Sequence, residues 1–113
     1  MLKFTNEFKI ILPKKDNEGI ALDHEKQVIN LCKVFGGATV TENNGFWYDE
    51  GKLYKDENIQ VACFYSELDN EMKEAVKQAV KYGFNDCKQL AITVTINGTN
   101  IILEESKEVN ELL

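Results

Sequence analysis

The sequence contains no arginine, one histidine, one proline and no long hydrophobic run. Without arginine, and with a net charge of −6, the chain lacks the basic cluster that binding to nucleic-acid phosphates requires. No apolar stretch approaches the roughly 18 residues that a membrane-spanning helix needs. Residues 1–12 mix charged and apolar side chains, unlike the hydrophobic core of a signal peptide. We therefore expect a cytoplasmic protein with no nucleic-acid partner and no membrane partner.

Residues that could support nucleophilic or acid–base catalysis are also scarce. His24 is the only imidazole, and we interpret it as an exposed first-turn residue at a predicted helix start. The adjacent carboxylates Asp49-Glu50 and Asp56-Glu57 lie in predicted loops, where neighbouring side chains usually point to water. The sequence accordingly predicts no catalytic residue.

The three cysteines, Cys32, Cys63 and Cys87, form no C-x-x-C pair. Each has apolar neighbours, which is typical of a reduced thiol in or near a core. His24 has no cysteine or second histidine at ligand spacing, so we expect no metal site and no cofactor.

The remaining composition describes an ordinary globular chain. Its 113 residues, 43% of them apolar and 28% charged, are enough for one domain with a real core. We expect a single domain over residues 1–113, in which the acidic end, residues 105–113, can form a loose tail. The net negative charge is compatible with a basic protein partner or simply with solubility.

Hydrophobic periodicity predicts strands and helices in alternation. The run Phe8–Leu12 is typical of a buried strand stopped by Pro13. A helix follows, with Asp23 as a plausible N-cap and Gly36-Gly37 as its C-terminal stop. A second, amphipathic helix is expected to start after Ser66 and to end at Gly83. A strand from Leu90 to Ile96 follows. It is expected to turn back at Asn97-Gly98 and to pair with residues 99–103.

Between the two predicted helices, residues 36–65 are typical of a long β-hairpin. Its turn is predicted at Asp49-Glu50-Gly51. We expect Asn43-Asn44-Gly45 to form a bulge or bend and residues 55–58 to bend the returning strand. The order β-α-β-β-α-β, with an extra C-terminal hairpin strand, predicts an α+β ferredoxin-like two-layer sandwich with an antiparallel sheet.

The aromatic residues of this hairpin are the candidate binding site. They are Phe46, Trp47, Tyr48 and Tyr54. Because strand side chains alternate, Trp47 faces away from Phe46 and Tyr48, and one of these sets lies on the face that the helices leave open. Three interpretations are open: packing at the edge of the core, an interface with a partner or second subunit, or a small-ligand pocket.

Several motifs resemble those of small proteins encoded by phages, prophages, plasmids and some archaea. They are Gly36-Gly37-Ala38-Thr39, Gly45-Phe46-Trp47, the turn at residues 49–53, the Lys55-Asp56-Glu57 stretch, and the closing hairpin around Asn97-Gly98. The pattern is also similar to an uncharacterised bacterial family of ferredoxin-like layout. Such chains often carry Gln-Glu after the second helix, where this one has residues 85–89, Asn-Asp-Cys-Lys-Gln.

Together with the absence of a catalytic set and the polar neighbours of the aromatic residues, the resemblance implies a non-enzymatic binding protein of a mobile genetic element, working as a homo-oligomer in the cytoplasm of a bacterial host. We expect it to antagonise a host defence component by binding a protein or a small signalling molecule. Two alternatives stand beside this hypothesis. One is a small ferredoxin-like enzyme with an active site between subunits, and the other is a purely structural oligomer subunit.

Overall fold

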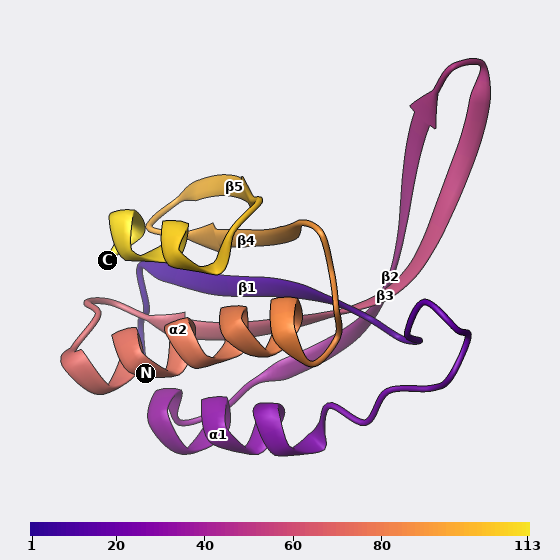
Figure 1. Ribbon diagram of the computed structural model, residues 1–113. Coiled ribbons are helices and arrows are strands. Elements are labelled where there is room, and N and C mark those ends of the chain that lie inside the picture. The colour runs from indigo at the N-terminus through magenta and orange to yellow at the C-terminus, as the bar shows by residue number, and fades with distance from the viewer.

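The computed structural model describes residues 1–113 and contains one five-stranded antiparallel sheet in the order β2-β3-β1-β4-β5. The strands and helices are β1 (Asn6–Pro13), α1 (Glu25–Phe35), β2 (Thr39–Asp49), β3 (Lys52–Tyr65), α2 (Asn70–Asn85), β4 (Ile92–Ile96), β5 (Thr99–Leu103) and η1 (Ser106–Leu112). Both α-helices run beside each other along one face of the sheet (Figure 1). The α+β ferredoxin-like sandwich with an added C-terminal strand is therefore confirmed.

The core lies between the helices and one face of the sheet. Alternate residues of β1, Phe8, Ile10 and Leu12, are buried completely or nearly so. Phe35 at the end of α1 stacks on Phe8 and meets Tyr65 of β3 edge to face, with centroids 6.1 Å apart in both pairs. The opposite face of the sheet carries half-exposed and exposed side chains, so it remains open.

The first helix begins one residue later than the sequence indicated. His24 occupies the N-cap position, and Asp23 instead accepts a hydrogen bond from the backbone N–H of Glu25 at 3.0 Å. At the other end, Gly36 adopts φ 89°, and its N–H donates to the carbonyl of Cys32 at 2.8 Å. The predicted glycine stop is confirmed.

The prediction that Gly83 ends the second helix is wrong, because α2 continues to Asn85. Gly83 is buried inside the last turns of the helix, where it lies against Ile92 of β4. A Cβ atom at this position would lie 2.7 Å from the Ile92 Cδ1 atom. The glycine therefore permits close helix–sheet packing. At the start of α2, the Asp69 carboxylate accepts from the N–H of Met72 at 2.9 Å.

The long hairpin is confirmed, and its ladder contains no bulge, although the two strands curve together away from the rest of the sheet (Figure 1). β2 and β3 pair continuously from Thr39↔Ala62 to Asp49↔Lys52. A two-residue turn closes the ladder, with φ 49° at Glu50 and 80° at Gly51. The outer part of this hairpin, residues 44–57, extends beyond the helices as an arm without a covering layer (Figure 1).

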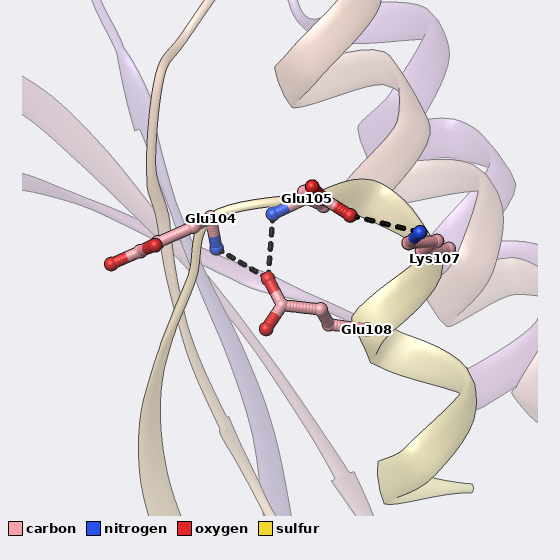
Figure 2. Close-up of polar contacts among 4 residues, drawn as sticks. All are labelled: Glu104, Glu105, Lys107 and Glu108. Carbon is pink, nitrogen blue, oxygen red and sulfur yellow. Dashed lines mark hydrogen bonds and ion pairs between the residues drawn. The ribbon is translucent and has the colours of Figure 1, made fainter.

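The C-terminal residues are ordered against the domain rather than forming a loose tail. The Glu108 carboxylate accepts from the backbone N–H groups of Glu104 and Glu105, at 2.8 and 2.6 Å, and fixes the start of η1 (Figure 2). Val109 is 3% exposed and belongs to the core cluster. Leu112 and Leu113 are partly buried against the same cluster, so the short helix is docked beside α2.

Candidate functional site

His24 is buried, which corrects its interpretation as an exposed residue. Its Nε2 lies 2.7 Å from the carbonyl oxygen of Pro13, and its Nδ1 lies 2.6 Å from the hydroxyl of Tyr82. A carbonyl only accepts hydrogen bonds, so Nε2 carries a proton and donates to Pro13, while Nδ1 shares a hydrogen bond with the Tyr82 hydroxyl. His24 thus links the end of β1 to α2. Both nitrogens are occupied, so the ring is not free to act on a ligand.

Two of the three thiols, those of Cys63 and Cys87, are poorly suited to nucleophilic chemistry. Cys63 and Cys87 are buried, and Cys32 is half-buried. Burial raises the pKa of the Cys63 thiol to about 12, and it also raises the pKa of Cys87. A thiol with a raised pKa remains protonated at neutral pH and is a weak nucleophile. No group of three or more His, Cys, Asp or Glu side chains is placed to hold a metal ion.

The arm exposes its aromatic residues on both sides. Trp47 and Tyr54 are directly opposite in the ladder and stack, with centroids 4.1 Å apart and planes at 12°. On the other side, Tyr48 lies opposite Leu53 and Phe46 lies opposite Lys55. Trp47 is 49% exposed and Tyr48 is 71% exposed, and none of the four predicted aromatic residues belongs to the core. The structure brings them together on the arm.

A hollow of about 410 Å³ lies where the base of the arm meets the open face of the sheet. We call it the aromatic hollow. Strand residues Ile11 and Ile102 and the methyl group of Thr93 contribute apolar surface, and Trp47 contributes an aromatic side chain. Phe46 also borders the hollow, although its side chain points to the other side of the ladder. Four polar side chains also line it: Asn43, Asp56, Asn58 and Gln89. This volume and this mixture of apolar walls with a few polar groups suit a small ligand.

Sequence reasoning missed the polar residues of the aromatic hollow. The prediction that Asp56 and Glu57 lie in a loop is wrong, because both belong to β3, where successive side chains point to opposite sides. The register places Asn43 opposite Asn58 and Gly45 opposite Asp56, on the same side of the ladder as Trp47. The available signal was the spacing of two residues between Asn43, Gly45 and Trp47, which places them on one side of a continuous strand. The bulge or bend predicted at residues 43–45 interrupts that strand, so the sequence did not indicate a shared side.

None of the helices combines the length and the apolar composition that a bilayer-spanning segment requires. Comparison with known proteins finds no matching protein family and no matching curated protein. Among solved structures, a phage SAM lyase in complex with S-methyl-5′-thioadenosine is similar, with a TM-score of 0.63 and 16% identity over 93% of this chain and 95% of that chain. A phage SAM lyase in the apo state has a TM-score of 0.57 and 17% identity over 88% of both chains. This chain therefore has the fold of those lyases over nearly its whole length.

Proposed function

We propose that this chain is an anti-defence protein of a phage or related mobile element that binds S-adenosylmethionine (SAM) in the aromatic hollow and converts it to S-methyl-5′-thioadenosine. The observation that carries this proposal is the similarity of fold, over 93% of the chain, to a phage SAM lyase. The aromatic hollow supports it independently, because its volume is large enough for a nucleoside. Removing SAM would deprive methyltransferases of the host of their methyl donor.

The residues of the aromatic hollow match the chemical groups of SAM. Adenine has a flat π-face, and Trp47, held in place by its stack on Tyr54, offers an aromatic surface for it. The sulfonium sulfur carries a positive charge, and Asp56 is the only acidic side chain that lines this hollow. The amide side chains of Asn43, Asn58 and Gln89 can donate to and accept from ring nitrogens and ribose hydroxyls.

Formation of S-methyl-5′-thioadenosine from SAM breaks the bond between sulfur and the γ-carbon of the amino-acid side chain, and the electron pair of that bond stays on sulfur. The substrate's own carboxylate oxygen bonds to the same γ-carbon, so the amino-acid part leaves as a lactone. The step neutralises the sulfonium and needs no metal or nucleophile from the protein. A site without a reactive histidine or cysteine is therefore compatible with it. What the chain supplies in this proposal is a fixed orientation of the ligand and exclusion of water by apolar walls.

Binding without turnover is the second candidate, and the scarcity of titratable side chains in the aromatic hollow favours it. Asp56 is the only such side chain there, so a protein that merely sequesters SAM or a related signalling nucleoside would need nothing more. In this case the ligand remains intact on the protein.

Incubating the purified protein with excess SAM and separating the products by liquid chromatography tests both candidates. We expect S-methyl-5′-thioadenosine to accumulate beyond one equivalent per chain and above the spontaneous background. Intact SAM that co-elutes with the protein, without product, would favour sequestration. If millimolar SAM is neither bound nor consumed, the proposed function is wrong.

We also propose that copies of this chain associate through the arm. β2 is an edge strand of 11 residues, and it contains none of the proline, lysine or bulge devices that usually protect an exposed edge. Its unpaired backbone groups can pair with a strand of a second copy and cover the exposed aromatic side chains. Light scattering is expected to give a multiple of the 12.9 kDa chain mass, and a strictly monomeric mass would contradict this expectation.

A further inference from the structure

A second hollow, of about 460 Å³, adjoins the aromatic hollow at the base of the arm. We call it the polar hollow. The two hollows share four lining residues, Pro13, Asp56, Asn58 and Gln89. Its remaining lining comes from the loop after β1, at residues 15–19, and from Lys55 and Glu57 of β3. Because side chains alternate along β3, Lys55 and Glu57 point away from the side that carries Asp56 and Asn58. A ligand that spans both hollows therefore passes from one side of the strand to the other across the shared residues, with one end in aromatic and the other in polar surroundings.

The polar hollow holds two lysines that have no ion-pair partner within the chain. Lys15 and Lys55 line it, and neither has a carboxylate at ion-pair distance. The neighbouring Lys14, by contrast, pairs with Glu42 at 2.9 Å. The aromatic hollow contains no basic residue. Positive charge available to a ligand is thus confined to the polar hollow.

The loop that carries Lys15 is held in place by its own hydrogen bonds. Asp16 Oδ1 accepts from the backbone N–H groups of Glu18 and Ile20, both at 2.9 Å. The backbone N–H of Lys14 donates to the carbonyl of Glu57 at 3.0 Å, which joins the loop to β3. A hollow built on a fixed loop and a strand loses little conformational entropy when a ligand binds.

We infer that the polar hollow binds the zwitterionic amino-acid end of a ligand whose nucleoside end occupies the aromatic hollow. The ligand's carboxylate lies toward Lys15 and Lys55, and its ammonium group lies toward the acidic side chains on the same rim, such as Glu57. This inference rests on the proposed function for the nucleoside end. It adds selectivity, because a nucleoside that ends in an amino acid binds more tightly than the thioether that remains after cleavage.

Calorimetric titration with two unreactive nucleosides tests this inference. S-adenosylhomocysteine carries the amino-acid end, whereas S-methyl-5′-thioadenosine lacks it. In the double variant Lys15→Ala/Lys55→Ala, we expect the affinity for S-adenosylhomocysteine to fall by about tenfold or more, while that for S-methyl-5′-thioadenosine changes less than about twofold. The control Lys33→Ala/Lys81→Ala removes the same charge from exposed lysines of the helical layer that also lack ion pairs, and should alter neither affinity.

The outcomes separate the inference from the proposed function. If the unmodified chain binds neither nucleoside, the proposed function fails. If it binds both and the Lys15/Lys55 variant weakens both equally or neither, the aromatic hollow stands and the assignment of the polar hollow is overturned. Equal losses in the two double variants would show a general effect of net charge, which also overturns the assignment.

Discussion

Replacing Trp47 with alanine is expected to weaken binding of an adenine nucleoside by roughly 5- to 150-fold, since stacking of a base on an aromatic ring contributes about 1–3 kcal/mol. Trp47 lines the aromatic hollow and is supported from behind by its stack on Tyr54 at 4.1 Å. Titration with S-methyl-5′-thioadenosine measures the loss. The free energy of unfolding should change little, because Trp47 is 49% exposed and lies outside the core.

Tyr48→Ala is the matched control for this experiment. Tyr48 is the adjacent aromatic residue on the same strand, but it points to the other side of the arm and does not line the aromatic hollow. Its loss should leave nucleoside affinity unchanged. If both variants bind as tightly as the parent chain, the aromatic hollow is not the nucleoside site. If Trp47→Ala mainly lowers stability, a structural role for the arm is favoured.

The second large effect is expected at Tyr65, where replacement by alanine should lower the free energy of unfolding by about 3–5 kcal/mol. Tyr65 is 1% exposed and packs edge to face against Phe35. Its hydroxyl donates to Asn97 Oδ1 and accepts from the Asn97 N–H, both at 2.7 Å. A single side chain therefore fills the core and connects β3 to the β4–β5 turn.

Urea denaturation of Tyr65→Phe separates these two contributions. Phenylalanine keeps the ring but leaves the Asn97 N–H without its partner, so we expect a loss of about 1–3 kcal/mol. Tyr48→Ala again serves as the control, because an exposed tyrosine on the arm should cost no more than about 0.5 kcal/mol. A Tyr65→Ala variant as stable as Tyr48→Ala would contradict the packing described for the core.

The order of elements could be predicted from local signals because each signal acts over a few residues. Asn97-Gly98 adopts the two positive φ angles, 48° and 77°, that a tight hairpin turn requires, and Gly36 ends α1 for a related reason. The predicted end of the second helix was wrong because a contact between distant segments overrode the local signal. Gly83 appears in the sequence as a helix stop, yet packing against Ile92 keeps it inside the helix.

His24 shows the same limit for a candidate catalytic residue. Its position beside Asp23 at a helix start predicted exposure, but the partners that bury it, Pro13 and Tyr82, lie 11 and 58 residues away along the chain. No pattern within one element encodes those partners. The polar residues of the aromatic hollow were missed for a similar reason, since Gln89 reaches it from the connection after α2.

By itself, the sequence determined the α+β class, the antiparallel hairpins and the concentration of aromatic residues between the two helices, because periodicity and turn chemistry are local. Only the tertiary structure decided that Trp47 stands exposed beside Asp56, that the helices leave one face of the sheet open, and that two hollows meet at the base of the arm. These features depend on which strands become neighbours and on how far the β2–β3 hairpin extends beyond the two helices that cover the sheet. Contacts between distant segments set both.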